Sequence, residues 1–473
     1  MRKNRVVIAL LWITLALAAC AGARADPATP APAATPPIGG LRAASRLTLP
    51  MLKATPKLPW LLGMDAPRTY LILVQNNDEL RATGGFLSAV GTLGIDRGRP
   101  GDVDFVDSYT VARDDVEHPW APDPMRKYMG IDLMFVRDAN WSPDLPTTGQ
   151  LVKALYAQDA GVLVDGVITI DMNAVRLLID ALGPLQIEGA DEPITGDNLI
   201  EQVVQFWDRP VETGTIAEAG LENWWQQRKD FMPALAKAAL ERLRSGDVSP
   251  LALAAAAYQA LDQRSIQVWI DDPVVGDILA DEYWDGAIAP AAGSDFLALV
   301  DTNVGYNKVD AVLDRSLDYR VTWPDGSAAP AVAQATVTYR HPIQMPGYVC
   351  DPSPRYGDNY EDMTRRCYFD YVRLYVPAGS ELIAVDGVAS DSVTSERADH
   401  NTQVFGGYFT LLPGYQHSVQ FTYRLPPEIT PADYALVVQR QSGLEALPVT
   451  LTAGEESLAT EMATSRLEWS PAR

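Results

Sequence analysis

Two short polar segments place arginine beside carboxylate side chains, directly after apolar runs that are typical of strands. One segment, residues 76–86, follows the run 70–75 and contains Arg81, while the other begins at Arg137-Asp138 after the run 133–136. A guanidinium next to a carboxylate can bind a phosphate group together with a divalent cation. Because ligands of open α/β sheets bind beyond the carboxyl ends of strands, both segments are candidates for a phosphate or oxyanion site.

Each segment also has a purely structural interpretation. Residues 76–86 could form a capped turn, in which asparagine and aspartate bond to the backbone and glycine supplies a positive φ. Arg137-Asp138 and a third cluster, Arg113-Asp114-Asp115, could be surface pairs worth under about 1 kcal/mol each. Trp141 could cover a ligand or fill the core.

The N-terminus carries an export signal. Three basic side chains precede the apolar run 6–19, which is too short to span a bilayer and fits a secretory signal. Leu17-Ala18-Ala19-Cys20 matches the lipobox of bacterial lipoproteins, in which the cysteine receives a diacylglyceride. Cleavage after residue 25 is the alternative. We expect residues 1–20 to be a lipoprotein signal peptide and Cys20 to anchor the protein on the extracytoplasmic face of the cell membrane.

The remaining cysteines fit an exported protein. Cys350 and Cys367 are separated by sixteen residues. An even number of cysteines in an oxidising compartment is most simply explained by a disulfide. We therefore predict a Cys350–Cys367 disulfide.

Composition excludes several classes of function. The formal net charge of −23 disfavours binding to nucleic acid, because an acidic surface repels phosphate backbones. The chain contains no H-E-x-x-H pair, no G-x-S-x-G elbow and no G-x-x-x-x-G-K-[ST] loop. The sequence therefore gives no support for a zinc protease with the H-E-x-x-H motif, for an elbow-type serine hydrolase or for a P-loop hydrolase.

The apolar pattern predicts two folded parts after an Ala/Pro-rich tether over residues 21–55. Residues 56–310 alternate strands with helices, and the strand 161–170, helix 173–182 and strand 185–187 suggest a βαβ unit. Short alternating strands without helices fill residues 311–473. The expected fold class is α/β: an α/β/α sandwich with a mixed sheet, followed by a C-terminal all-β sandwich domain.

A family resemblance adds to this reading. The strings LVQNNDELRATGGF (73–86), RDANWSPDLPT (137–147), VDGVITID (164–171) and LLIDALGPLQI (177–187) look like the bacterial domain-of-unknown-function family 4012, and residues 303–308 resemble its later motif. The resemblance covers about residues 70–308. That family carries no established activity.

The chain is more distantly similar to the LytR-CpsA-Psr (LCP) cell-wall glycopolymer transferases. These extracellular α/β/α enzymes move glycopolymers from polyprenyl-pyrophosphate, with arginines on the pyrophosphate and aspartates on Mg²⁺. Residues 177–187 match their Leu-Val-Asp-x-Leu-Gly-Gly-Val pattern, and Arg81-Ala82-Thr83-Gly84 stands where they have Arg-x-Asp-Thr. Arg137-Asp138 or Arg113-Asp114 stands where they have Pro-Arg-Asp-Thr. This chain lacks the aspartate two places after Arg81, so Asp78 or Glu79 would have to replace it.

The resemblance implies a set of site residues. The expected catalytic residues are Arg81, Arg137 and Asp138; the substrate-binding residues Asn76, Asn77, Thr83, Arg113 and Trp141; and the Mg²⁺ ligands Asp78, Glu79 and Asp144, together with Asp138. Two hypotheses follow. The protein binds or transfers a polyprenyl-pyrophosphate-linked glycopolymer as an LCP-like phosphotransferase, or it is a non-enzymatic envelope scaffold or adhesion protein with an inactive site. The expected partners are the membrane, a polyprenyl-phosphate lipid and a cell-wall glycan.

Overall fold

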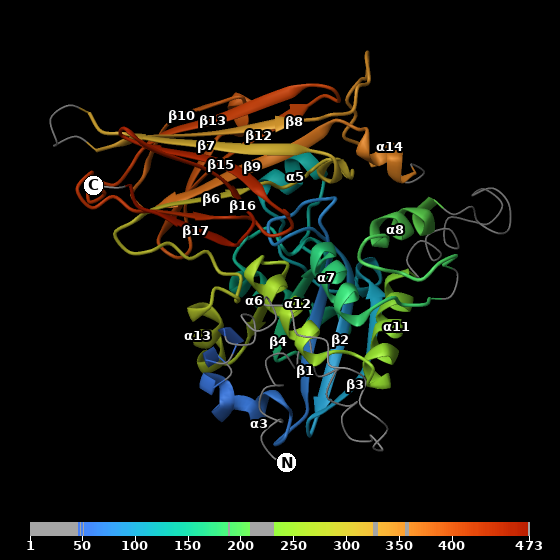
Figure 1. The fold of residues 1–473 in the computed structure, drawn as a ribbon. Helices are drawn as coiled ribbons and strands as arrows, with labels where there is room; N and C mark the ends of the chain where they lie inside the picture. Colours follow the sequence, from blue (N-terminus) through green and yellow to red (C-terminus); the bar gives the residue numbers. More distant parts are fainter. Residues whose placement is uncertain are drawn as a thin grey trace, which may run out of the picture.

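The molecule has two tiers, a helix-covered sheet below and a pair of β-sheets above (Figure 1). The computed structural model describes residues 46–47, 49–50, 52–187, 190–208, 231–324, 330–354 and 359–471. The expected signal peptide, Cys20 and most of the tether lie outside these residues. Within the described part of the chain, no helix is both long enough and apolar enough to cross a bilayer.

The lower tier is an α/β body built on a five-stranded sheet with the order β3-β2-β1-β4-β5. Its strands are β1 (Arg68–Asn76), β2 (Phe86–Asp96), β3 (Arg99–Asp107), β4 (Gly166–Asp171) and β5 (Ile266–Ile270). β1 and β4 run parallel, and the other neighbouring strands are antiparallel. The sheet is therefore mixed, as the sequence predicts.

Helices cover both faces of this sheet, because its central strand β1 is apolar on both sides. Tyr70 and Ile72 pack in the cluster that includes α7 (Met172–Leu182), α11 (Phe231–Ser245) and α12 (Pro250–Asp262). Leu71 and Leu73 point the other way, toward α5 (Asp123–Met129) and α6 (Leu145–Ala160). This alternation is the period of a strand, and it produces the α/β/α layers.

The other helical segments connect these layers or lie at the surface. They are η2 (Thr55–Lys57), α3 (Leu58–Leu61), α4 (Ser108–Val111), η3 (Val136–Asp138), α8 (Leu199–Asp208), α13 (Pro273–Asp281), η4 (Val309–Ala311), α14 (Tyr360–Thr364) and η5 (Ser390–Ser392).

Two expected strands are wrong. Residues 185–187 do not enter the sheet: Leu185 makes a single bridge to Ile194, and β5 occupies the place beside β4. The run 133–136 makes one bridge, from Leu133 to Trp120, and then turns into η3. The parallel pair of the sheet is thus β1 with β4 and not the proposed βαβ unit.

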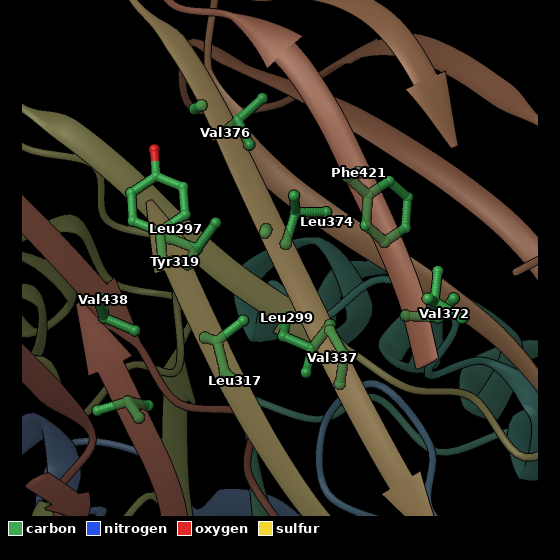
Figure 2. Close-up of a cluster of buried hydrophobic side chains, with 14 of the residues drawn as sticks. Leu297, Leu299, Leu317, Tyr319, Val337, Val372, Leu374, Val376, Phe421 and Val438 are labelled. Carbon is green, nitrogen blue, oxygen red and sulfur yellow. The ribbon is translucent and has the colours of Figure 1, made fainter. Parts of the chain in front are cut away.

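The upper tier is a β-sandwich of two six-stranded sheets, ordered β10-β13-β8-β7-β15-β16 and β11-β12-β9-β6-β14-β17. The strands are β6 (Asp295–Val300), β7 (Asp314–Thr322), β8 (Val332–Arg340), β9 (Tyr368–Pro377), β10 (Glu381–Asp386), β11 (Thr394–Ala398), β12 (Thr402–Leu411), β13 (Gln416–Arg424), β14 (Leu436–Gln439), β15 (Leu447–Ala453), β16 (Glu456–Met462) and β17 (Arg466–Trp469). Leu317 and Tyr319 of β7 face Leu374 and Val376 of β9 across a continuous apolar core (Figure 2).

Strand β6 joins the sandwich from a segment that precedes residue 311. It pairs with β9 and β14 and is buried along its whole length. The strand order therefore groups residues 295–300 with the sandwich. Elsewhere in the sandwich, Cys350 and Cys367 form the predicted disulfide, with Cα atoms 5.5 Å apart.

Candidate functional site

The segment after β1 folds back against its own sheet instead of opening toward solvent. The carbonyl oxygen of Thr83 accepts hydrogen bonds from the amides of Gln75 and Gln267, at 2.9 and 2.7 Å. Asn140 donates to the carbonyl oxygen of Gly85 at 2.8 Å. An oxyanion cradle would turn N–H donors toward a ligand, but here the side-chain amides donate to backbone carbonyl oxygens of the segment itself. The segment therefore has the contacts of a capped turn.

The two glycines of this segment permit close backbone contacts. A Cβ atom on Gly85 would lie 2.4 Å from the carbonyl carbon and oxygen of Asn76. Gly84 has a φ of +135°. A Cβ atom on Gly443 of the sandwich would lie 2.0 Å from the carbonyl oxygen of Gly84. Gly84 therefore permits close packing between the two tiers, and Gly85 permits the close approach of the segment to the end of β1 within the α/β body.

Arg81 is a buried structural cation. Its side chain is 4% exposed and forms an ion pair with Glu79 at 2.7 Å. The same guanidinium donates to the carbonyl oxygens of Leu80 and Asn303. Since Asn303 follows β6, Arg81 joins the α/β body to the sandwich and its charge is already balanced.

A chain of aromatic rings and cations runs from Arg81 to Arg137. The Arg81 guanidinium lies 5.9 Å from the ring of Phe86, which lies 6.0 Å from Tyr109. The Arg137 guanidinium lies 4.7 Å from the Tyr109 ring and 4.5 Å from the ring of Phe135. The two predicted arginines thus lie at the same end of the sheet. Arg137 differs from Arg81 in keeping 20% of its side chain exposed.

Asp138 is buried beside Arg137. Its Oδ2 atom lies 3.3 Å from Nε of Arg137, and the carboxylate is 4% exposed. Burial raises the pKa of Asp138 to about 6, against the opposing effect of the Arg137 and Arg81 charges. In this pair the Arg137 guanidinium is partly exposed, whereas the Asp138 carboxylate is buried.

Arg113 does not join this group. It pairs with Asp115 at 2.5 Å, and both side chains are about half exposed or more. Its contact is that of an ordinary surface pair.

The expected metal ligands do not converge. Asp78 accepts a hydrogen bond from Tyr360, and Glu79 is paired with Arg81. Asp144 caps α6 by accepting from the backbone N–H of Thr147 at 2.9 Å, and it also accepts from the backbone N–H of Ile288 at 3.0 Å. Among the described residues, no group of three histidine, cysteine, aspartate or glutamate side chains could hold a metal ion. Asp138, the fourth expected ligand, is near enough to Glu79 for that charge to raise its pKa, but Glu79 pairs with Arg81 and Asp138 with Arg137. These residues do not fit Mg²⁺, because the four carboxylates are not gathered in one place.

The expected substrate-binding side chains serve the fold. Asn76 Oδ1 accepts from the backbone N–H of Asp78 at 3.1 Å, and Asn77 Oδ1 accepts from that of Met172 at 3.3 Å. Trp141 lies against the sandwich, where the guanidinium of Arg373 sits 4.0 Å from its ring. None of the three is placed next to Arg137 by these contacts.

Sequence reasoning missed an apolar cavity on the face of the sheet covered by α7 and α11. It has a volume of about 160 Å³. Every described residue that lines it is apolar: Ile72, Val74, Leu93, Val103, Phe105, Ile170, Val175, Leu178, Ile179, Leu182, Met232, Leu235, Ala236, Ala239, Leu240, Leu243 and Leu253. The sequence does indicate the apolar side chains of β1 and the apolar face of α7 that line this cavity. Neither pattern shows that the helices leave space above the sheet.

The cavity follows the length of the sheet. Leu93 pairs with Tyr70 near the start of β1, while Val74 lies near its end. Four residues of strand span about 13 Å. Phe86, the first ring of the aromatic chain, pairs with Asn76, only two residues beyond Val74. The cavity therefore extends toward the same end of β1 as the aromatic run, while Val136 and Ala139, which flank Arg137, pack on the opposite face of the sheet.

Residues 65–205 match the family model described as protein of unknown function DUF4012. The matched segment makes up less than a third of the chain. The match covers four of the five sequence motifs, and it confirms the resemblance. No curated protein matches the chain.

Several solved structures match part of the chain at low identity. Protein gbs0355 from Streptococcus agalactiae is 14% identical, with a TM-score of 0.28 over 46% of this chain and 73% of that one. TagV of B. subtilis is 11% identical, with a TM-score of 0.23 over 46% and 80%. A LytR-Csp2A-Psr enzyme from Actinomyces oris is 15% identical, with a TM-score of 0.21 over 41% and 76%. Similarity at this level carries no inference about activity.

Proposed function

We propose that the protein is an exported cell-envelope protein, anchored by lipid at Cys20, whose α/β body binds the hydrocarbon chain of a polyprenyl-phosphate lipid that carries a glycan. The observation that supports this proposal most directly is the apolar cavity between the sheet and α7 and α11. A dry apolar cavity of about 150 Å³ can bind a group the size of benzene. A cavity of about 160 Å³ therefore suits a branched segment of hydrocarbon, with the rest of the chain continuing outside it.

The phosphate group of such a lipid would meet Arg137. Arg137 is the partly exposed cation of the aromatic chain, and that chain begins two residues of β1 beyond the cavity. A guanidinium held between Tyr109 and Phe135 can donate several N–H groups to phosphate oxygens. Arg81 is unsuited to this role, because Glu79 and two carbonyl oxygens already occupy its guanidinium.

We favour binding over transfer. Stabilising a leaving pyrophosphate requires preorganised cations that face the reacting group, and Arg137 is the one member of the expected catalytic set that is both cationic and accessible. The expected Mg²⁺ ligands are engaged elsewhere. The Cys350–Cys367 disulfide supports export, since such bonds persist in oxidising compartments.

Titration with farnesol, farnesyl phosphate and farnesyl pyrophosphate tests this function. All three should bind, because the chain enters the cavity, and the phosphorylated forms should bind about ten-fold more tightly through Arg137. Arg137→Ala should remove that difference, whereas Arg113→Ala, a matched exposed arginine, should not. Addition of Mg²⁺ or EDTA should leave the affinities unchanged.

Two outcomes would contradict the proposal. Absence of binding by all three probes would exclude the lipid site. Mg²⁺-dependent transfer of the glycan, with its attached phosphate, from polyprenyl pyrophosphate to an acceptor hydroxyl, leaving polyprenyl phosphate, would replace the binding protein with a transferase.

A further inference from the structure

A second hollow lies between the α/β body and the last strand of the sandwich. It has a volume of about 540 Å³, within the range of small-molecule sites, which favour boundaries between domains. Its lining residues are Arg46, Tyr258, Asp262, Asp281, Glu282, Tyr283, Trp284, Thr464, Ser465, Arg466 and Glu468. In Figure 1, β17, which contributes Arg466 and Glu468, lies above α13, which ends at Asp281. We call this hollow the β17 cleft.

Tyr283 provides a fixed aromatic wall. Its side chain is 40% exposed, and its φ of +59° lies in the left-handed region that non-glycine residues rarely adopt. The guanidinium of Arg466 stacks 4.5 Å from the Tyr283 ring. Arg466 is itself held by Glu468 at 2.8 Å and by the carbonyl oxygen of Ala289 at 2.7 Å. A strained residue that its neighbours hold in place is typical of ligand sites, because binding then costs little further ordering.

Polar groups surround this ring. Asp262 lies at the C-terminal end of α12, and its carbonyl oxygen accepts from the backbone N–H of Ser465 at 2.9 Å, which ties the two walls together. Thr464 and Ser465 contribute hydroxyls, and Arg46 contributes a guanidinium. Planar carboxylate and guanidinium groups can bond two adjacent hydroxyls at once, while the C–H face of a sugar packs on an aromatic ring.

The charge of the β17 cleft restricts its ligand. Four carboxylates face two guanidiniums, and one of these carboxylates, Asp281, is paired with Lys53 at 2.7 Å. With Lys53 counted, one negative charge remains in surplus, so phosphate and sulfate groups gain no net attraction from these walls. A ligand that combines many hydroxyls with apolar C–H faces and no negative charge fits these walls.

We propose that the β17 cleft is a binding site for a neutral oligosaccharide. The site is separate from the apolar cavity and from Arg137, and it requires only the contact between the two tiers. Its occupation does not depend on lipid binding, so each site can be tested while the other is empty.

Isothermal titration of the full-length protein with cellohexaose, maltohexaose and chitohexaose tests the proposal, together with hydrogen exchange to locate the bound sugar. At least one of the three should bind at millimolar concentration or below and protect residues 279–284 and 464–468. A heparin hexasaccharide should not bind. Tyr283→Gly removes the ring and also relieves the backbone, so the fold is kept while the affinity falls about ten-fold or more.

Tyr415→Ala is the matched control, because Tyr415 is a 64% exposed tyrosine outside the cleft. It should bind as the unchanged protein does. The proposal is overturned if no neutral hexasaccharide binds, if Tyr283→Gly binds as tightly as Tyr415→Ala, if protection appears elsewhere, or if the heparin fragment binds equally well.

Discussion

The side-chain amide of Gln441 in the sandwich donates a hydrogen bond to the main-chain carbonyl oxygen of Arg81 in the α/β body, at 3.0 Å. The same amide donates to the carbonyl oxygen of Asp301 at 2.8 Å, and its own oxygen accepts from the backbone N–H of Asp301 at 2.8 Å. One buried side chain therefore joins the segment 76–86 to the end of β6. The segment 76–86, the most conspicuous polar motif of the sequence, therefore connects the two tiers.

Arg81→Ala should destabilise the protein because it leaves Glu79 buried without its partner. Removing one member of a buried ion pair costs about 3–5 kcal/mol, and chemical denaturation should show this loss in the free energy of unfolding. The double variant Arg81→Met, Glu79→Leu should recover much of it, since no unpaired charge remains. If Arg81→Ala unfolds at the same denaturant concentration as the unchanged protein, Arg81 is not a structural cation.

Gly85→Ala should cost about 2–3 kcal/mol of stability, because the added methyl group would overlap the Asn76 carbonyl and force the backbone apart. Gly276→Ala provides the comparison. Gly276 lies inside α13, and a Cβ atom added there would meet nothing within 4 Å, so alanine there should stabilise the helix by about 0.5–1 kcal/mol. Thermal unfolding of the two variants should shift in opposite directions, and equal shifts would argue against the close packing of the Gly84-Gly85 segment.

The contact between Asp144 and His400 should make stability depend on pH. The hydrogen bond that Nε2 of His400 donates to the Asp144 carboxylate, at 2.9 Å, raises the pKa of His400 above its ordinary value near 6.5, although partial burial opposes this. A raised pKa contributes stability that is complete below the unfolded-state pKa and is lost as the pH rises through the folded-state pKa. His400 is 41% exposed, so solvent screening keeps this contribution under about 1 kcal/mol.

His400→Asn tests this contact, because asparagine tolerates the positive φ of 55° at this turn. Its loss of stability relative to the unchanged protein should be larger near pH 5.5 than near pH 8.5. Asp144 does not disturb the comparison: burial raises its pKa, but the bonds from His400 and Thr147 lower it overall, so it stays ionised throughout this range. If His400→Asn loses the same stability at both pH values, His400 and Asp144 do not form a charged pair.

Reduction of the Cys350–Cys367 disulfide should lower stability by about 3 kcal/mol, the amount expected for opening a loop of this length. Denaturation with and without reductant measures it. A variant with serine at both positions should show the lower stability under both conditions. Unchanged stability after full reduction would show that the loop does not need the bond.

Local patterns of the sequence predicted much of the fold. β1 is buried on both faces of its sheet, so its residues form a continuous apolar run. β7 and β8 are buried on one face only, so apolar and polar residues alternate along them. The helices α6 and α7 were equally readable. β6 was not, since a short apolar run such as residues 295–300 does not by itself distinguish a strand from a buried helix.

The site was harder to predict, because its partners come from distant parts of the chain. Nothing near Arg81 in the sequence indicates that Asn303 and Gln441 would meet it. The cavity is also invisible locally, since it depends on how closely α11 approaches the sheet. The grouping of Arg81, Arg137 and Asp138 at one end of the sheet was predicted, whereas the separation of Arg113, Asp78 and Asp144 was not.

Native mass spectrometry with farnesol tests the central claim, that the apolar cavity holds a prenyl chain. The unchanged protein should form a complex with one farnesol. Ala239→Phe, which fills the cavity from α11, should not. Lys237→Phe adds the same ring at an exposed position of α11 and should bind as the unchanged protein does. Equal farnesol binding by Ala239→Phe and Lys237→Phe, with both variants folded, would contradict the account.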